Sequence, residues 1–581
     1  MIKRQRPGVL AVRAVNQYRR RDVLTYLALR YYLDNDAART DQWTREVATD
    51  LVLSRSEPVY FQALHFKDVS HQKTIDHRHM LLPGANEALA EAALLEECAR
   101  HSAVFGNPPC VFSYPLSSGD DRSGVFAHYS KGLRDRHEAI AVACQDNPDG
   151  LVRYVDLKKF YPSITIAVAL TAWRAAAERA GLDRRWRELG EKLLDDHGRA
   201  QPGQASILTG PMFSHLIANL VLRKLDDEFS SDAQVRYFRY VDDITLVGAR
   251  EIVTKTLRDI RDRVATSGLA IHEDHSPKSL TLTANDWIVG GRDFRDSRRQ
   301  ISWMTLIGDL KRYLLANPDS HDVLRNAFAN AGLRIPVRDY SSAIFERSFL
   351  EHIEQWAKRS WFRRKVRTVS VDSLLEQALW LRESYGREFG ELMDGFDQAS
   401  PYERKRRIPK LRYRAGRLTY LATDDELAVL SAQADTVKEL HLQSMAMAAV
   451  ASGHIDSLLK LGTNAAQAAA QPMRAGKKRA SFSATELSEA ETQALAVFRL
   501  NGVQVRDVQG SLDGGSELLT FADRGANAEL MKSTDRFMSE FACLHGITGE
   551  PRHATMLESV FDEDEELAID AVDQLGQSIS P

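Results

Sequence analysis

Cysteine is scarce in this chain, long apolar runs are absent, and neither sign of charge is in clear excess. The 581 residues include four cysteines, none in CxxC spacing, which argues against a disulfide framework or a cysteine metal site and fits a reducing cytoplasm. Without a run of about 18 apolar residues, neither a membrane-spanning helix nor a membrane partner is expected. The net charge of −3 excludes a uniformly cationic coat for nucleic acid, but not local basic patches.

What the chain does contain changes in character along its length. The length predicts about three or four structural units. Residues 15–100 are mostly helical in pattern, residues 151–300 alternate short strands with helices, and amphipathic helices follow after residue 310. Serial helices without strands favour an α-helical repeat array, although the sequence shows no strict period.

Two adjacent carboxylates interrupt a strand-like run at RYVDDITLVG, residues 239–248. Asp is depleted from strands, so the pattern predicts a tight hairpin with Asp242 and Asp243 at or near its turn. Asp156 ends another strand-like run, and pairing of that strand beside the hairpin would bring the three carboxylates together. Such a cluster cannot stay fully ionised alone, whereas Mg²⁺ prefers these oxygen ligands and paired ions promote phosphoryl transfer. A solvated turn and an ordinary strand-end Asp are the alternative interpretations.

The segments around these carboxylates resemble the ordered motifs of reverse transcriptases. The similarity covers residues 105–295, and the order of the motifs together with the YVDD box makes it specific. The matching segments are VDLKKFYPSI (155–164) for motif A, GPMFSHLIANLVL (210–222) for motif B, YVDD (240–243) for motif C, SGLAIHEDHSPKS (267–279) for motif D and, poorly, WIVGG (287–291) for motif E.

This resemblance implies roles for individual side chains. Asp156 and Asp242 would ligate two Mg²⁺ ions, for which Mn²⁺ can substitute, with Asp243 as a weaker ligand. Tyr161 matches the steric gate that favours dNTPs over NTPs. Lys278 falls where motif D supplies a cation that protonates or neutralises pyrophosphate, although an ordinary surface lysine is an equal alternative.

Further substrate contacts are implied less specifically by the same resemblance. Taken singly, each basic residue among them is better interpreted as a solvated surface residue. Thr209 stands where the family usually has Gln, in ILTGP (207–211), and this departure puts ordinary template-directed copying in doubt. The implied substrate contacts are Phe160, Thr209, Gly210, Arg122, Lys131 and Arg134.

The altered motif B and the long helical C-terminal half together resemble the bacterial abortive-infection reverse transcriptases of the AbiK and AbiA type. That resemblance implies antiphage defence, a homo-oligomer, and single-stranded DNA synthesis that needs no template and starts from a protein tyrosine, so that the product stays covalently attached. RNA is a further partner that it implies. The candidate priming residues are Tyr18, Tyr26, Tyr31 and Tyr32, each of which reads by itself as a core or surface aromatic residue.

Two basic stretches in the helical half are candidates for binding a single strand. Residues 356–367 interleave aromatic rings with Lys and Arg, and residues 403–417 are densely basic, a composition that suits phosphates and stacked bases. A solvated helix face with core tryptophans is the alternative. The residues assigned to this contact are Trp361, Arg363, Arg364, Arg406, Arg407 and Arg412.

The expected fold is therefore an α+β polymerase palm and fingers, as in the reverse-transcriptase right hand, followed by an α-helical, HEAT-like repeat domain. The expected function is a Mg²⁺-dependent DNA polymerase, with a template-copying reverse transcriptase and a catalytically silent nucleic-acid scaffold as alternatives. The expected divisions are an N-terminal helical region and fingers (1–104), fingers and palm (105–300), a helical repeat domain in place of a thumb (301–462), a linker or mobile segment (463–490) and a C-terminal helical region with an acidic tail (491–581).

Overall fold

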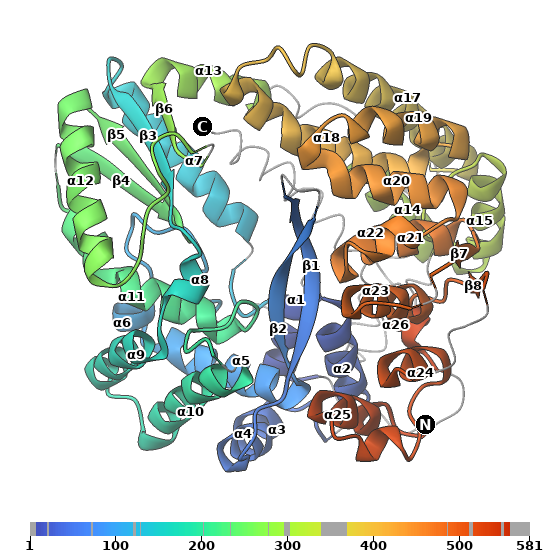
Figure 1. The fold of residues 1–581 in the computed structure, drawn as a ribbon, viewed down its shortest axis with the longest axis horizontal. Coiled ribbons are helices and arrows are strands. Elements are labelled where there is room, and N and C mark those ends of the chain that lie inside the picture. Colours follow the sequence, from blue (N-terminus) through green and yellow to red (C-terminus); the bar gives the residue numbers. More distant parts are fainter. Residues whose placement is uncertain are drawn as a thin grey trace.

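The chain folds into helices and small sheets, and the second half is predominantly helical (Figure 1). The mixed α/β class and the helical C-terminal region predicted from the sequence are thereby confirmed. The computed structural model describes residues 7–19, 22–35, 37–70, 74–119, 124–127, 129–201, 203–232, 234–276, 278–295, 302–337, 369–484, 486–509, 515–547 and 551–557.

A four-stranded antiparallel sheet organises residues 151–283, in the strand order β4-β5-β3-β6. Its strands are β3 (Leu151–Asp156), β4 (Val235–Tyr240), β5 (Asp243–Gly248) and β6 (Leu280–Thr283). The hairpin predicted around Asp242 and Asp243 is confirmed, because a two-residue loop joins β4 to β5.

Helices cover both faces of this sheet because side chains alternate along each strand. Val155 packs into the larger core. Val152, on the other face, lies in a small cluster with Ile140 and Trp287. The helices of this region are α7 (Tyr129–Asp146), α8 (Phe160–Ser163), α9 (Ile166–Ala180), α10 (Arg184–Ala200), α11 (Met212–Ser230), α12 (Arg250–Thr266) and α13 (Ala284–Arg295).

The N-terminal region contains a long hairpin that the helical pattern of residues 15–100 did not predict. Strands β1 (Tyr60–Val69) and β2 (Ile75–Pro83) pair antiparallel. Much of this hairpin packs on residues distant in sequence, so no local periodicity indicates it. The surrounding helices are α1 (Val9–Tyr18), α2 (Val23–Asp34), α3 (Asp41–Trp43), the π-helix η1 (Thr44–Ala48), α4 (Thr49–Ser54), α5 (Ala85–Arg100) and α6 (Ser102–Phe105).

The C-terminal half is a succession of helices with one short parallel strand pair. The strands are β7 (Ala480–Phe482) and β8 (Val505–Asp507). The α-helices are α14 (Trp303–Ala316), α15 (His321–Asn330), α17 (Val371–Met393), α18 (Pro401–Leu421), α19 (Asp424–Asp435), α20 (His441–Ser452), α21 (Asp456–Leu459), α22 (Thr463–Ala475), α23 (Glu489–Leu500), α24 (Glu517–Arg524), α25 (Arg536–His545) and α26 (His553–Leu557), with 3₁₀ turns η3 (Pro318–Ser320), η6 (Lys438–Leu440) and η7 (Leu530–Lys532).

The linker predicted at residues 463–490 is wrong, because α22 and β7 occupy most of it. Ala465, Ala469 and Met473 of α22 are fully buried. The alanine-rich composition resembles a low-complexity linker, but alanine is the best helix former and its small side chain allows close helix packing. The acidic tail expected at the C-terminus lies outside the described residues.

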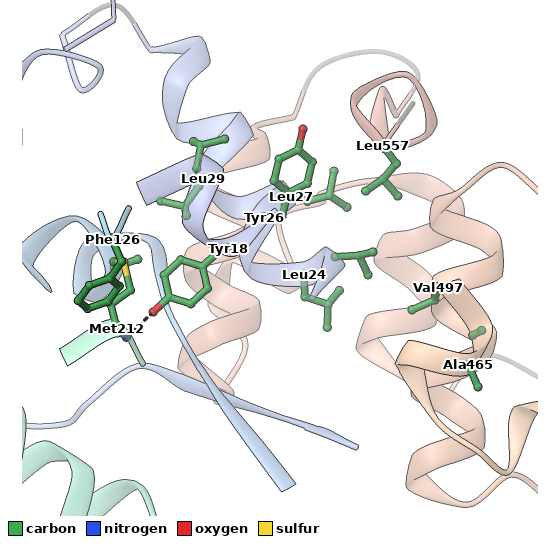
Figure 2. Close-up of a cluster of buried hydrophobic side chains, with 14 of the residues drawn as sticks. Tyr18, Leu24, Tyr26, Leu27, Leu29, Phe126, Met212, Ala465, Val497 and Leu557 are labelled. Atoms are coloured by element: carbon green, nitrogen blue, oxygen red, sulfur yellow. Dashed lines mark hydrogen bonds between the residues drawn. The ribbon is translucent and has the colours of Figure 1, made fainter. Parts of the chain in front are cut away.

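The two ends of the chain share one core. Figure 2 shows Leu24 and Leu27 of α2 among side chains of the C-terminal helices, including Val497 and Leu557. This contact region, in which α2 meets α22, α23, α25 and α26, is called the terminal junction below. It joins the start of the chain to its last described helix.

The β1–β2 hairpin lies between the four-stranded sheet and the C-terminal helices (Figure 1). Its backbone contacts two glycines: Leu81 N donates to Thr209 O at 2.8 Å beside Gly210, and Leu64 O lies against Gly462. A Cβ atom on either glycine would overlap the hairpin carbonyl, so both positions require the missing side chain.

None of the helices in the described part of the chain combines the length and the apolar character needed to cross a membrane.

Candidate active site

Strand register brings the three predicted carboxylates to one place, called the acidic tip below. Asp156, the last residue of β3, pairs with Asp243, the first residue of β5. Asp242 lies in the adjoining two-residue loop, and its carbonyl accepts a hydrogen bond from Leu157 N at 3.0 Å. The predicted juxtaposition of Asp156 with the hairpin is therefore confirmed.

A buried ion pair fixes the loop that carries the tip. Arg239 donates to both carboxylate oxygens of Asp226, at 2.7 Å each, and both side chains are fully buried. A third guanidinium nitrogen group, Nη1, donates to Val241 O at 2.8 Å, and Ser113 Oγ accepts from Val241 N at 3.0 Å. These bonds hold Val241 at a φ of 55°, which a β-branched residue rarely adopts.

Burial and mutual repulsion both act on the carboxylates of the acidic tip. Burial, and then the charges of Asp243 and Asp156, raise the pKa of Asp242 to about 7. Burial also raises the pKa of Asp156, even though Lys278 acts in the opposite direction. A cluster in this condition favours a bound cation, which would return the carboxylates to their ionised form.

Protein groups already contact two of the three carboxylates. Lys278 Nζ lies 3.0 Å from Asp156 Oδ2, and His272 Nε2 lies 3.3 Å from Asp156 Oδ1. The Tyr154 hydroxyl donates to Asp243. The motif D lysine thus reaches the acidic tip, while its role towards pyrophosphate stays a prediction.

The residues of the tip suit a divalent ion in kind and in charge. Carboxylate oxygens are the donors that Mg²⁺ prefers, and the raised pKa of Asp242 reflects burial and then repulsion by Asp243 and Asp156. Over the described residues, however, no group of three or more His, Cys, Asp or Glu side chains is arranged to hold a metal. Asp156 is bonded to Lys278 and Asp243 to Tyr154, so a bound ion would have to replace these contacts.

The predicted gate, Tyr161, belongs to an aromatic group that sequence reasoning missed. Its hydroxyl lies 2.5 Å from Nδ1 of His215, a buried residue of α11. The His215 ring stacks on Tyr114 at a centroid distance of 3.8 Å. Phe160 is buried beside Tyr161. A histidine inside the otherwise apolar start of α11 was the available signal.

The other predicted substrate contacts lie in different surroundings. Thr209 and Gly210 form the segment that holds β2, as described above. Lys131 and Arg134 are exposed on α7, and Lys131 pairs with Asp135 at 2.6 Å. Arg122 lies outside the described residues.

Two further cations lie near the tip. Arg136 falls in the stretch where the resemblance implies triphosphate contacts, whereas for Lys405 the sequence indicates no role at this site. Arg136 of α7 is buried and donates to Thr245 Oγ1 at 2.7 Å. Lys405 of α18 places Nζ 4.3 Å from the centroid of the Tyr154 ring, and burial lowers the pKa of its ammonium group. Tyr154 therefore links a lysine of the helical half to a carboxylate of the tip.

Two arginines of the basic stretch on α18 donate to backbone carbonyls of neighbouring elements. Arg407 donates to Asp394 O at 2.7 Å, just after α17, and Arg412 donates to Glu439 O at 2.8 Å in η6. Arg406 is half-buried on the same helix. Nucleic-acid binding by this stretch remains a prediction, and Trp361, Arg363 and Arg364 lie outside the described residues.

The four candidate priming tyrosines are core residues in this structure. Burial raises the pKa of Tyr31 and Tyr32 and so disfavours their nucleophilic phenolate forms. Figure 2 shows Tyr18 hydrogen-bonded to Met212. The contacts of the four hydroxyls are Tyr18 with Met212 N at 3.1 Å, Tyr26 with Met556 O at 3.5 Å, Tyr31 with His553 Nδ1 at 2.5 Å and Tyr32 with Asn86 Oδ1 at 2.9 Å. None of them is presented at the surface in this conformation.

Comparison with known proteins adds no family assignment, because no protein-family model matches the chain and no curated protein matches it.

Proposed function

We propose that this protein is a Mg²⁺-dependent DNA polymerase of the reverse-transcriptase type. The observation that supports this most is the acidic tip, where Asp156 meets Asp242 and Asp243 through antiparallel register. Burial, and then repulsion by Asp243 and Asp156, raises the pKa of Asp242 to about 7, a condition that a bound cation would relieve. The order of the sequence motifs supports the same conclusion, with β3 as motif A and the β4–β5 loop as motif C.

In this proposal Asp156, Asp242 and Asp243 hold the divalent ions. When bound, such ions supply positive charge that stabilises the transferring phosphoryl group. The tip residues orient the nucleotide so that an attacking hydroxyl oxygen bonds to its α-phosphorus. The bond from that phosphorus to the β-phosphate oxygen breaks, pyrophosphate leaves beside Lys278, and the hydroxyl proton passes to solvent. Tyr161 lies under the sugar and excludes a 2′-hydroxyl.

The proposed biological role is bacterial antiphage defence by abortive infection, with synthesis that needs no template and a protein-linked product. It rests on the resemblance to the abortive-infection enzymes and on Thr209 in place of the usual Gln. The buried state of the four N-terminal tyrosines directs the search for a priming hydroxyl to other residues. A template-copying reverse transcriptase is the second candidate.

The decisive experiment offers the purified protein each labelled dNTP with Mg²⁺, with and without template and primer. Products are separated on denaturing gels before and after protease treatment. We expect incorporation without template, and label that travels with protein before protease. Product that appears only with a complementary template would instead favour the template-copying enzyme.

The matched variants are Asp242→Asn and Asp425→Asn. Asp242→Asn removes one charge from the tip and should lower incorporation by about a thousandfold or more, since metal-held charge supplies several kcal/mol. Asp425 is an exposed Asp of α19 in another Asp pair, so Asp425→Asn should retain activity. No incorporation by the wild-type protein under any condition would leave the catalytically silent scaffold.

A further inference from the structure

One side chain of the helical half reaches the acidic tip from a helix that the sequence motifs do not include. Lys405 Nζ lies 4.3 Å above the Tyr154 ring, and the Tyr154 hydroxyl donates to Asp243. Arg136 of α7 places its guanidinium carbon, Cζ, 6.0 Å from the centroid of the same ring. A single aromatic ring therefore separates the Lys405 ammonium from a carboxylate of the tip.

The position of Lys405 is fixed by the first turns of α18. Ser400 and Glu403 form a capping box in which each side chain bonds to the backbone of the other. Arg407 anchors the same turns to the end of α17 through Asp394 O. A rigid helix start limits the motion of the Lys405 stem, so its ammonium group is held beside the tip rather than left on a free surface.

The hydrogen-bonding capacity of Lys405 is unused within the part of the chain that the structure describes. An ammonium group has three N–H donors, and the contact with the Tyr154 ring engages its charge without an oxygen acceptor. Burial of this group carries a cost unless an acceptor is supplied. A ligand with several anionic oxygens would supply such acceptors.

Charge at the tip selects the chemistry of that ligand. Carboxylates, with ions bound as proposed above, would face a substrate that brings additional negative charge. Lys278 stands on one side of this cluster at Asp156, and Lys405 stands on another side at Tyr154. Two cations from separate parts of the chain suit a polyphosphate, whose charged oxygens extend over several ångströms.

We propose that Lys405 binds the triphosphate of the incoming nucleotide, so that the helical half completes the substrate site of the four-stranded sheet. This inference rests on the proposed function. It assigns to α18 a substrate-binding residue in addition to its structural arginines. Nucleotide binding then also links α18 to β3, which makes the placement of the helical half dependent on substrate.

The experiment measures binding separately from chemistry. The dissociation constant of dTTP in the presence of Ca²⁺ is determined by calorimetry, and KM and kcat for incorporation with Mg²⁺ are measured in parallel. The variants are Lys405→Met, which keeps the stem and removes the charge, and Lys405→Arg, which restores it. Arg404→Met removes a cation from the neighbouring position, where the described residues offer the side chain no ion pair.

Lys405→Met should weaken dTTP binding about tenfold or more, as expected for a lost charge-assisted hydrogen bond, and should raise KM. Lys405→Arg should recover most of the affinity, and Arg404→Met should stay within about twofold of wild type. Melting temperatures of all variants separate a loss of folding from a loss of binding.

Three other outcomes are distinguishable. Wild-type affinity for dTTP in Lys405→Met, with incorporation intact, would reduce Lys405 to a packing contact of Tyr154 and overturn the inference. Lys405-dependent binding without incorporation by the wild-type protein would overturn the proposed polymerase and leave the binding residue standing. Absence of both binding and incorporation in the wild-type protein would overturn both.

Discussion

The acidic tip and the terminal junction both unite distant parts of the chain, but they treat polar groups differently. At the junction, the Tyr31 hydroxyl meets His553 Nδ1 at 2.5 Å, and His553 Nε2 lies 3.1 Å from Phe521 O. These groups are neutral and mutually satisfied. At the tip, burial and then the like charges of Asp243 and Asp156 raise the pKa of Asp242 to about 7.

This difference distinguishes residues that stabilise the fold from residues that require a bound ligand. A neutral, fully paired network lowers the cost of burying polar groups and needs nothing further. Buried carboxylates that repel one another destabilise the protein by themselves. They are retained where a bound partner offsets that cost. Of the four tyrosines and the three aspartates named as candidates from the sequence, only the aspartates are in the second condition.

The largest expected effect concerns the ion pair under the tip. Asp226→Asn leaves Arg239 buried without its counter-charge and should lower the free energy of unfolding by about 3–5 kcal/mol, measured by urea denaturation. Asp227→Asn is the control, because Asp227 is exposed and pairs with Arg223 at 3.2 Å; it should cost less than about 1 kcal/mol. Equal losses of unfolding free energy in the two variants would show that the buried ion pair contributes no more than a surface pair.

The next largest effect is a loss of stability at low pH, caused by protonation of His553 in the terminal junction. Burial lowers the pKa of His553 to about 4, below its ordinary value of about 6.5, so the unfolded chain binds more protons between these values. Stability is therefore complete above about pH 6.5 and is lost as the pH falls towards 4, by up to about 3 kcal/mol. Denaturation at several pH values should show a flatter dependence for His553→Gln than for wild type. An unchanged slope would contradict the assignment of a neutral, buried imidazole.

A smaller effect is expected at the aromatic group beside the tip. His215→Phe keeps a ring on Tyr114 but removes the hydrogen bond between the Tyr161 hydroxyl and His215 Nδ1. Looser positioning of Tyr161 should reduce discrimination between dNTPs and NTPs by about tenfold, because small displacements of a positioning residue are costly. Tyr161→Phe, which loses the same bond, should behave alike. Single-nucleotide competition measures the ratio, and unchanged discrimination in both variants would exclude this support role.

The smallest effect is expected at the hydroxyl of Tyr31. Tyr31→Phe leaves His553 Nδ1 without its donor and should cost about 1 kcal/mol in unfolding free energy. Because this tyrosine is buried in the junction, nucleotide incorporation and any protein-linked label should persist. Loss of that label in a folded Tyr31→Phe protein would restore Tyr31 as a priming residue and weaken the contrast between the two regions.

The tip could be predicted from the sequence because its geometry is local in origin. A two-residue loop between alternating strands fixes Asp242 and Asp243, and one further strand pairing adds Asp156. The position of Lys405 could not be predicted, because it depends on how α18 is placed against β3. The same holds for Arg407 and Arg412, whose charges suggested nucleic acid but whose acceptors are carbonyls of other elements. The β1–β2 hairpin was missed for this reason as well.

The β1–β2 hairpin contacts two segments of the chain that are far apart in the sequence. Strand β2 contacts Gly210, two residues before α11, and strand β1 contacts Gly462, the residue before α22. Because Gln62 pairs with Leu81 and Leu64 pairs with His79, the two contacts lie close together along the paired strands. A methyl group at either glycine would displace the paired strands, and that shift would also change the contact at the other glycine. The hairpin therefore couples the starts of α11 and α22, which are far apart in the sequence.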